Sequence, residues 1–368
     1  MKVIMTGGGT GGHIYPAIAI ADEIRRRDSK AEILFVGAEI GMETTIVPEN
    51  GYKLELITTD GFNRRNLFKN IDVLKKLKKG SSQSKKILRE FAPDVVIGTG
   101  GYASAPVVKM AQSLKIPTFI QEQNAVPGMT NKLLERRVTN VFLGFEEGSK
   151  HFKYPKKHVV SGNPVREGFL HITRAEARAA LGIKDRDFML LSFGGSQGAG
   201  QINKAMLDVV ENFNGVDNFR IFMATGGYYY DAMFEELKDR GIRLHDNITL
   251  IEYIHDMAKY LMAADLVVGR SGALSVAEIT ICGKPAIFIP SPIVTGNHQY
   301  YNAISVAQRG GAIVIEEKYL GEKSLAKEIL KLKNNPEILR DMAGKSAGCA
   351  PLKAASIICD TVLNAVKK

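Results

Sequence analysis

Residues Met5–Ala21 read MTGGGTGGHIYPAIAIA, a glycine-rich loop between a short apolar run and a segment with helically spaced apolar residues. The loop contains Gly7-x-Gly9-x-x-Gly12, which is the spacing of a dinucleotide-binding loop. A dinucleotide loop, however, has no evident use for His13, the next residue. The stretch therefore predicts a strand, a phosphate-binding turn and a helix, and it leaves open which phosphate ligand the turn holds.

Apolar runs of strand length alternate with amphipathic segments of helix length along most of the chain. The runs are KVIMT, EILFVG, KLELIT, DVVIGTG, PTFIQ and NVFLGF in the first half, and FMLLSFGG, FRIFMAT, NITLIE, DLVVGR, PAIFIP and AIVIE in the second. Such alternation is typical of doubly wound parallel α/β sheets. The number of runs exceeds what one such sheet usually holds, and Val159–Gly168 is a break punctuated by glycine and proline. We therefore expect two Rossmann-like domains facing a cleft, at residues 1–162 and 163–350, and a C-terminal helix at 351–368 that packs back towards the hinge.

The composition is that of a globular protein. Of the 368 residues, 45% are hydrophobic and 24% are charged, which predicts a sizeable core rather than disorder. Cys282, Cys349 and Cys359 are too few and too scattered for a disulfide framework or a metal cluster. The first residues lack a signal-peptide pattern, and no stretch reaches the roughly 18 apolar residues of a spanning helix. We therefore expect a cytoplasmic protein.

Four glycine-rich loops follow predicted strands, two in each half of the chain. Because ligands of open α/β sheets bind beyond the carboxyl ends of the strands, these loops are the expected binding sites. Glycine allows the backbone to approach a ligand, and the following helix presents N–H groups and its positive dipole end to an anion. A single loop of this kind often serves only its turn, but four favour phosphate binding. They are Gly7–His13, Gly98–Ser104, Gly194–Gly200 and Gly269–Glu278.

Individual side chains in and near these loops narrow the chemistry. A dinucleotide site needs an acidic residue at the end of the second strand, and Glu39 comes later than that rule wants. A neutral imidazole at His13 can take a proton or hydrogen-bond a diphosphate. In the second half, Ser196 is placed to hold phosphate and Glu278 to accept ribose hydroxyls. The plainer alternatives are that His13 only bonds a nearby carbonyl and that Glu278 is a surface residue.

The sequence holds no cluster of metal-ligating residues. A DxD motif, which anchors a metal-bound nucleotide in many sugar transferases, occurs as Asp185-Arg186-Asp187. It precedes the run FMLLSF and so lies at the amino end of the predicted sheet, away from the ligand side. We interpret it as a turn, and we expect loops and cations to stabilise a leaving group.

Several motifs together resemble the MurG family of bacterial N-acetylglucosaminyltransferases. Between residues 7 and 303 they are, in order, GGGTGGHIYPAIAIA, PDVVIGTGGYAS, QEQNAVPGMTNK, SGNPVR, FGGSQGA, RSGALSVAEI and NHQYYNA. The resemblance implies a GT-B fold with the acceptor site in the first domain and UDP-GlcNAc mainly in the second. It implies an inverting hexosyltransferase that moves GlcNAc to the C4 hydroxyl of the MurNAc of undecaprenyl-diphospho-MurNAc-pentapeptide (lipid I). The product is lipid II for peptidoglycan synthesis, on which cell shape and division depend. No cofactor and no nucleotide-bound metal is implied.

The resemblance also implies roles for single positions. Donor contacts are implied at Thr10, Gly11, Gly12, Asn124, Arg166, Ser196, Ile254, Ala273, Leu274, Ser275, Val276, Ala277, Glu278 and Gln299. Acceptor diphosphate contacts are expected at Gly9, His13, Gly100, Gly101 and Tyr102. A base must take the proton of the acceptor hydroxyl, and His13 and Glu122 are both candidates. Arg166 or Arg270 is expected to meet the charge that develops on UDP.

This sequence departs from the family pattern at a few places. Gln121 stands where many relatives have His, and Met223-Ala224 replaces a His-Gln pair. No donor contact named above is lost through these departures. They leave the surroundings of the site and the pose of the acceptor open.

The net charge of +10 is concentrated in the first half. Residues 1–160 carry 25 Lys and Arg against 16 Asp and Glu, and the rest carry 24 against 23. Gly61–Gly80 (GFNRRNLFKNIDVLKKLKKG) alone holds seven basic residues and one Asp. One interpretation is a helix that buries its apolar stripe in its own domain. The other is a basic face on an anionic membrane, so that the protein is peripheral on the cytoplasmic side of the cell membrane. The membrane-facing residues would be Leu67, Phe68, Ile71, Leu74, Lys75, Lys76, Lys78 and Lys79.

Three other functions fit parts of this pattern. A related GT-B transferase could glycosylate another membrane lipid such as diacylglycerol. An NAD-dependent oxidoreductase would use the first loop, and a sensor would bind UDP-GlcNAc without turnover. The basic charge would suit nucleic acid, but no groove-reading motif accompanies it, so we expect no nucleic-acid partner. The expected partners are UDP-GlcNAc, lipid I, the anionic membrane and proteins of the wall-building machinery.

Overall fold

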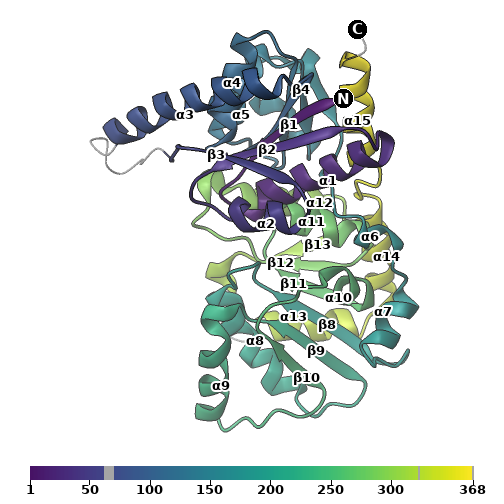
Figure 1. Cartoon of the computed structure of the whole chain (residues 1–368). Helices are drawn as coiled ribbons and strands as arrows, with labels where there is room; N and C mark the ends of the chain where they lie inside the picture. Colours follow the sequence, from purple (N-terminus) through teal and green to yellow (C-terminus); the bar gives the residue numbers. More distant parts are fainter. Residues whose placement is uncertain (62–69, 322–323, 367–368) are drawn as a thin grey trace. The chain divides into compact units, whose positions relative to one another are not determined.

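Two parallel sheets organise the chain (Figure 1). The structure is a computed structural model that describes residues 1–61, 70–321 and 324–366. It divides into two compact units, the first comprising Met1–Arg166 with Lys353–Lys368 and the second comprising Glu167–Leu352. The division falls after Arg166 rather than after residue 162, so Asn163 and Arg166 belong to the first unit.

The first unit contains a seven-stranded parallel sheet in the order β3-β2-β1-β4-β5-β6-β7. Its strands are β1 (Lys2–Gly7), β2 (Glu32–Ala38), β3 (Lys53–Ile57), β4 (Val95–Gly100), β5 (Thr118–Glu122), β6 (Asn140–Leu143) and β7 (His158–Val160). Its helices are α1 (Gly11–Arg27), α2 (Glu43–Glu49), α3 (Asn70–Phe91), α4 (Ser104–Ser113), α5 (Met129–Leu134) and α15 (Ala354–Val366), with 3-10 turns η1 (Glu135–Arg137), η2 (Glu146–His151) and η3 (Pro155–Lys157). The strand order reverses between β1 and β4, which is where doubly wound sheets bind ligands.

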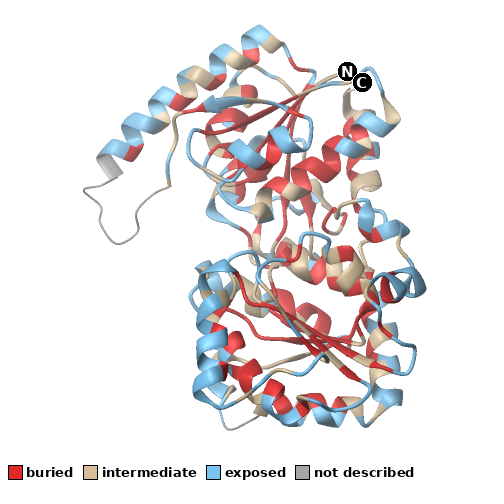
Figure 2. Ribbon diagram, turned by 60° about the horizontal axis from the view of Figure 1, so that its bottom comes forward, coloured by how far each residue is buried: buried red, intermediate tan, exposed pale blue. Residues whose placement is uncertain are grey.

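Alternating residues of the strands serve two cores, one on each face of this sheet. In β1, Val3 and Met5 pack into the core formed with α1 and α15, whereas Ile4 packs into the core formed with α3 and α4. This is the expected outcome for a strand that is apolar on both faces. In Figure 2 the central strands are buried, whereas the edge strands β3 and β7 are partly exposed.

The C-terminal helix α15 packs on α1. Its Ile358 and Val362 lie fully buried in the same core as Ile18 of α1. Arg27, in the last turn of α1, bonds the side chain of Asp360 and donates to the Ser356 hydroxyl at 2.6 Å. The end of the chain is thereby fastened to the unit with which the chain begins.

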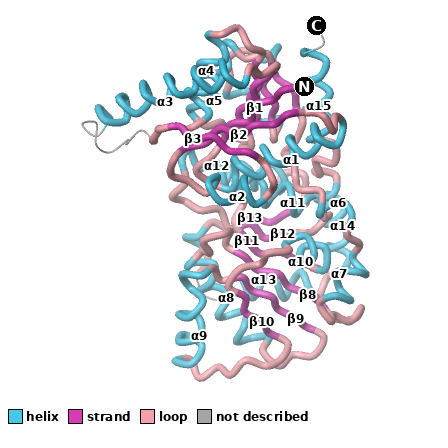
Figure 3. The backbone as a smooth tube through the Cα atoms, viewed as in Figure 1, coloured by secondary structure: helices cyan, strands magenta, loops and turns pink. Residues whose placement is uncertain are grey.

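The second unit contains a six-stranded parallel sheet in the order β10-β9-β8-β11-β12-β13, which reverses between β8 and β11 (Figure 3). Its strands are β8 (Phe188–Phe193), β9 (Phe219–Ala224), β10 (Ile248–Ile251), β11 (Leu266–Gly269), β12 (Ala286–Phe288) and β13 (Ala312–Val314). Its helices are α6 (Gly168–His171), α7 (Arg174–Ala180), α8 (Gly200–Phe213), α9 (Tyr230–Asp239), α10 (Met257–Ala263), α11 (Ala273–Ile281), α12 (His298–Ala307), α13 (Ser324–Lys333) and α14 (Pro336–Ala347), with 3-10 turns η4 (Gly227–Tyr229), η5 (Thr295–Asn297) and η6 (Glu317–Tyr319).

All twelve predicted runs form strands, and the two predicted parallel sheets are confirmed. The sequence missed β7, an edge strand of three residues that pairs with β6. Two of its residues, Val159 and Val160, lie in the predicted break between the domains. No helix in the described part of the chain is long and apolar enough to span a membrane.

Candidate functional site

The first two glycine-rich loops meet at the carboxyl edge of the first sheet, after the neighbouring strands β1 and β4. Gly9 has a φ of +84°, and Gly100 and Gly101 have φ values of +102° and +83°, which side chains rarely allow. A Cβ atom placed on Gly101 would lie 2.3 Å from the carbonyl oxygen of Gly8. The two loops therefore pack backbone against backbone, and only glycine fits at position 101.

A buried carboxylate that the sequence analysis missed supports the first loop. Glu43, at the start of α2, is fully buried. Its Oε2 accepts the backbone N–H of Gly9 at 2.8 Å, and its Oε1 accepts that of Ala38 at 3.0 Å. Cβ atoms on Gly8 and Gly41 would lie 2.1 and 2.2 Å from its oxygens. Glu43 thus fills the space beneath the loop and fixes the direction of one of its N–H groups.

His13 lies in the first turn of α1 and is half-buried. Its Nδ1 is 3.1 Å from Oε1 of Gln123, and the Thr99 hydroxyl donates to its backbone carbonyl at 2.7 Å. A Cβ atom on Gly100 would lie 3.0 Å from the imidazole, so the second loop also packs against the ring. The ring is therefore held in place from β4 and from the end of β5.

Glu122, the other predicted base, is 2% exposed at the end of β5. Its Oε1 accepts the N–H of Asn124 at 3.0 Å and the amide of that residue at 3.3 Å. Its Oε2 accepts the N–H of Gly128 at 3.0 Å and the side-chain amide of Asn131 at 2.8 Å. The carboxylate thus holds the loop between β5 and α5, and its position for proton transfer stays a prediction.

Other predicted residues of the first unit are distributed around these loops. Thr10 and Gly12 are exposed, and Tyr102 is 57% exposed beside the second loop. The guanidinium of Arg166 lies 5.0 Å from the centre of the Tyr15 ring, which places it over α1. These residues therefore share one edge of the sheet with His13.

The third glycine-rich loop lies after β8 in the second unit. Gly195 and Gly198 have φ values of +90° and +77°. A Cβ atom on Gly198 would lie 2.0 Å from the carbonyl oxygen of Thr225, so this loop packs closely against the end of β9. The close packing leaves Ser196 exposed at the tip of the loop.

The fourth loop lies after β11, next to β8, and leads into α11. Glu278 is half-buried in the second turn of α11. The Gln299 side chain accepts the N–H of Ser291 at 2.9 Å, and its carbonyl accepts the Ser271 hydroxyl at 2.8 Å. The predicted donor residues Ala273–Glu278 and Gln299 are therefore brought together in this unit. Ile254 follows β10, and its side chain is buried.

The helices after these four loops begin without side-chain caps. Helices α1, α4, α8 and α11 have neither an acidic residue in the first turn nor a side-chain capping bond. The same is true of α5, α6 and α12, so what sets the four apart is that each follows a strand at a point of strand reversal. By contrast, α7 is capped by Thr173 in a capping box and α10 by Asp256. When no side chain caps a helix, the N–H groups of its first turn can donate to a ligand. The positive end of the helix dipole then favours an anion as that ligand.

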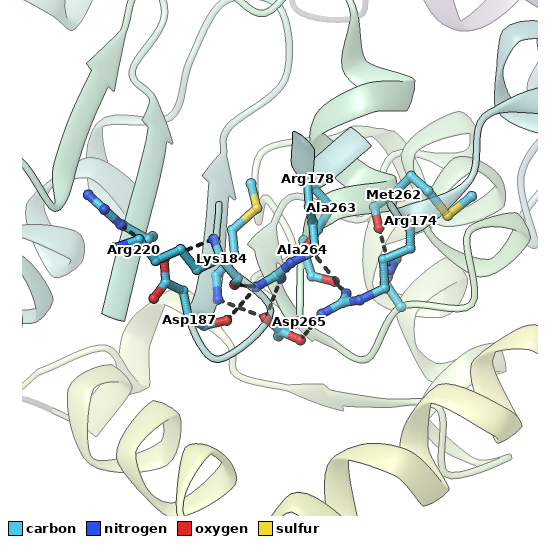
Figure 4. Close-up of polar contacts among 11 residues, drawn as sticks. Arg174, Arg178, Lys184, Asp187, Arg220, Met262, Ala263, Ala264 and Asp265 are labelled. Atoms are coloured by element: carbon cyan, nitrogen blue, oxygen red, sulfur yellow. Dashed lines mark hydrogen bonds and ion pairs between the residues drawn. The ribbon is translucent and has the colours of Figure 1, made fainter. Parts of the chain in front are cut away.

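The DxD motif is a turn, as predicted. Asp185 and Arg186 form a turn before β8, and Asp187 accepts the N–H of Lys184 at 3.2 Å. Figure 4 shows that this end of the sheet is occupied by an ion-pair network in which Arg174 and Arg178 bond Asp265. Within the described residues, no group of three His, Cys, Asp or Glu side chains could hold a metal ion.

Arg270 is one of the two residues expected to meet the charge that develops on UDP. Its guanidinium bonds other residues of the second unit. It forms an ion pair with Glu317, and its guanidinium also donates to the carbonyl of Ile289 at 2.9 Å. Both side chains of this ion pair are largely buried.

The basic segment is partly described by α3. Figures 1 and 2 show the first turns of this helix extending beyond the sheet of the first unit. Lys75, Lys78 and Lys79 are exposed, and Leu74 is 55% exposed, whereas Val73 is buried. Lys76 donates to Asp60 at 2.9 Å, a hydrogen bond that lowers the pKa of the Asp60 carboxyl. Of the other predicted membrane-facing residues, Leu67, Phe68 and the side chain of Ile71 lie outside the described residues.

Two doubly wound units with glycine-rich loops at their points of strand reversal form the GT-B fold, which the crystal structure of MurG also has. Residues 3–143 match the glycosyltransferase family 28 N-terminal domain, and residues 189–358 match the C-terminal domain of that family. The chain belongs to the MurG family within glycosyltransferase family 28.

Individual relatives are similar over nearly their whole length. One is the UDP-N-acetylglucosamine--N-acetylmuramyl-(pentapeptide) pyrophosphoryl-undecaprenol N-acetylglucosamine transferase of Clostridioides difficile (strain 630), which is 45% identical over 99% of this chain and 88% of its own. The transferase of the same name from Thermoanaerobacter sp. (strain X514) is 42% identical over 97% and 98%. The crystal structure of Acinetobacter baumannii MurG matches with a TM-score of 0.77 and 27% identity over 99% of each chain. A UDP-GlcNAc 2-epimerase from Neisseria meningitidis shares the fold at 16% identity, with a TM-score of 0.71.

Proposed function

We propose that this chain transfers GlcNAc from UDP-GlcNAc to the C4 hydroxyl of the MurNAc of lipid I, with inversion at the anomeric carbon, and so forms lipid II. Membership of the MurG family supports the reaction and both substrates. One observation connects this reaction with particular residues. The four helices that follow the glycine-rich loops begin without caps, two of them at the point of strand reversal in each sheet. A nucleotide diphosphate and a lipid-linked diphosphate are the two anions that such sites would hold.

The second unit suits the donor. The N–H groups at the starts of α8 and α11 and the exposed hydroxyl of Ser196 are available to the diphosphate of UDP-GlcNAc. Glu278 would accept the ribose hydroxyls, because a carboxylate can accept two hydrogen bonds at once. Ile254 would contact uracil through its backbone, and Gln299 would contact the sugar hydroxyls.

The first unit suits the acceptor. The loop Gly7–His13, the glycines at 100 and 101, and Tyr102 would surround the diphosphate of lipid I. The C4 hydroxyl would attack C1 of GlcNAc while UDP leaves from the opposite face, and the hydroxyl proton would pass to the imidazole of His13. His13 is favoured over Glu122 because four hydrogen bonds already occupy the carboxylate of Glu122.

We propose that no metal ion is needed, because the charge developing on UDP would be met by the positive ends of α8 and α11 and by Arg166. The protein would act at the cytoplasmic face of the cell membrane as a peripheral enzyme. The exposed lysines and Leu74 at the start of α3 support this location, because basic residues with nearby apolar side chains bind anionic lipid surfaces.

The proposal is tested by following labelled GlcNAc from UDP-GlcNAc to a short-chain lipid I analogue in the presence of EDTA. A diacylglycerol acceptor is the parallel control. We expect transfer to the lipid I analogue alone, unaffected by EDTA. Transfer only to diacylglycerol would change the assigned acceptor, and binding of UDP-GlcNAc without transfer to either would indicate a sensor. Loss of transfer with EDTA would contradict the metal-free chemistry.

A further inference from the structure

A chain of buried amide side chains runs from His13 into the interior of the first unit. Gln123 contacts the imidazole, Gln121 contacts Gln123, and Asn163 contacts Gln121. These three residues are 2%, 0% and 1% exposed. Groups buried to this extent hydrogen-bond to one another rather than to water, so the direction of each bond follows from its neighbours. We call these three residues the amide relay.

Thr99 fixes the direction of Gln123. The Nε2 of Gln123 lies 2.7 Å from the backbone carbonyl oxygen of Thr99. A carbonyl oxygen can only accept a hydrogen bond, so the NH₂ group of Gln123 must face it. The Oε1 of the same amide therefore faces Nδ1 of His13, at 3.1 Å.

The hydrogen bonds of Asn163, at the other end of the amide relay, independently give the same orientation of the Gln123 amide. Asn163 Nδ2 lies 2.9 Å from the backbone carbonyl oxygen of Gln123, which again can only accept. Oδ1 of Asn163 must then accept from Nε2 of Gln121 at 2.9 Å. This turns Oε1 of Gln121 towards Nε2 of Gln123, with which it is in contact. Two backbone carbonyls at opposite ends thus specify one orientation for all three amides.

We infer that the amide relay fixes the tautomer of His13. A neutral imidazole has one N–H and one lone pair, and Oε1 of Gln123 is an acceptor that requires the N–H at Nδ1. The lone pair is then on Nε2, the nitrogen away from Gln123. Gln123 is therefore a positioning residue, and Gln121 and Asn163 hold it in the required orientation.

The consequence for catalysis rests on the proposed function. The Nδ1–H tautomer presents Nε2 as a base to the acceptor hydroxyl, and the imidazolium formed by proton transfer keeps its hydrogen bond to Gln123. Fixing a tautomer in this way is worth up to about 10⁴-fold in serine proteases, where a carboxylate has the same role. A neutral amide stabilises the imidazolium less strongly, so we expect a smaller effect here.

The tautomer can be measured without any substrate by ¹⁵N NMR of the full chain labelled at histidine. The His13 signals are identified by their loss in His13→Ala. In spectra recorded at a pH at which the ring is neutral, we expect a protonated Nδ1 and a bare Nε2. A protonated Nε2 in the unaltered chain would overturn the inference, whatever the activity of the enzyme.

Substitutions of the amide relay give a second measurement. Gln123→Met keeps the length of the side chain but removes the acceptor, so the Nδ1–H form should lose its preference. Gln121→His should keep the Nδ1–H pattern, because a neutral imidazole can donate to Asn163 and accept from Gln123. The matched control is Gln112→Met, since Gln112 makes a 3.4 Å bond to Leu134 away from His13. An unchanged ¹⁵N pattern in a folded Gln123→Met would contradict the inference.

Kinetics then separate positioning from general structural support. Gln123→Met should lower kcat by about 10-fold or more at an unchanged KM for UDP-GlcNAc. The pH at which kcat/KM rises should also change. A purely structural role of Gln123 would leave that pH unchanged, so the shift distinguishes the two roles. If the unaltered chain transfers no GlcNAc while its ring is protonated on Nδ1, the proposed function fails and the tautomer assignment stands.

Discussion

Glu43 and Gly9 are joined by a 2.8 Å hydrogen bond that ties the first residue of α2 to the glycine-rich loop after β1. The other oxygen of Glu43 holds Ala38 at the end of β2. One buried carboxylate therefore sets the position of two neighbouring strand ends. The loop that we assign to the acceptor diphosphate is shaped by a residue that need not touch the substrate.

Replacing Glu43 by Gln should destabilise the first unit. An amide NH₂ in place of one carboxylate oxygen would face a backbone N–H, leaving a buried donor without an acceptor, which costs about 1–3 kcal/mol. Urea unfolding should report this loss, and KM for the lipid I analogue should rise. Glu49→Gln, on the exposed side of the same helix, is the control and should change neither. Equal stability of the two variants would show that the hydrogen bonds of Glu43 have no net importance.

Glu122→Gln separates a supporting role from a catalytic one. Its amide would face two of the four donors that now bind the carboxylate, so we expect a loss of about 1–3 kcal/mol in the free energy of unfolding. The folded variant should retain more activity than His13→Ala, which removes the proposed base and should lower kcat by about 10²–10⁴-fold. A folded Glu122→Gln that is as inactive as His13→Ala would instead make Glu122 the base.

Glu278→Ala should raise KM for UDP-GlcNAc strongly and leave KM for the lipid acceptor nearly unchanged. A bidentate contact between carboxylate and ribose hydroxyls contributes about 1.5–3 kcal/mol, which corresponds to roughly 10- to 100-fold. Initial-rate kinetics with each substrate varied in turn would measure this effect. Glu235→Ala, an exposed carboxylate on α9, is the matched control. An unchanged KM for the donor would remove Glu278 from the ribose site.

Replacing the four lysines at the start of α3 with Gln should weaken binding to anionic vesicles. Each lysine near such a surface contributes about 1 kcal/mol, so the combined loss should be on the order of 10²–10³-fold. Sedimentation with phosphatidylglycerol vesicles would measure it, with neutral phosphatidylcholine vesicles for comparison. The variant changes Lys75, Lys76, Lys78 and Lys79, and its control removes the same charge from the second unit at Lys204, Lys238, Lys331 and Lys345. Equal losses in both variants would point to net charge rather than to this helix.

Lys284 should make stability depend on pH in the alkaline range. This residue is 6% exposed, and its ammonium donates to the carbonyl of Met262 at 2.7 Å. The ion-pair network of Arg174, Arg178 and Asp265 lies beside it (Figure 4). Burial, followed by the charge of Arg174, lowers the pKa of Lys284 from 10.5 to about 8.

Between these two pKa values the unfolded chain binds more protons than the folded chain, so stability should rise with pH. The total gain from pH 8 to 10.5 is about 3 kcal/mol. The measurement is the difference in free energy of unfolding between the unaltered chain and Lys284→Met as a function of pH. A difference that stays flat over this range would show that the lysine titrates normally.

Much of the fold could be predicted because the strands are apolar on both faces and glycine marks their carboxyl ends. The edge strand β7 escaped because three residues give no periodicity. In the basic segment the sequence left open whether Leu74 faces its own domain or a membrane, and α3 buries Val73 and exposes Leu74. The face that a helix buries depends on the neighbours against which it packs, and local spacing does not include them.

The geometry of the candidate site could be predicted where it depends on contiguous residues. Glycine-rich loops and His13 stand out in the sequence because a strand, a turn and a helix start are contiguous. Glu43 gave no signal, since its burial arises only when the loop after β2 folds beneath the loop after β1. The direction of the amide relay likewise depends on the carbonyls of Thr99 and Gln123, which only the folded chain brings into position.

The glycines around Glu43 also limit how this region can mutate. Cβ atoms on Gly8, Gly37 and Gly41 would each come within 2.1 to 2.7 Å of the Glu43 side chain. A change at any one of them would displace a carboxylate that has two buried hydrogen bonds, and a change of Glu43 alone would leave a void beneath the loop. A substitution at any one of these four positions should therefore disturb the packing of the other three. An inhibitor that contacts the backbone of this loop would face few single-step resistance mutations.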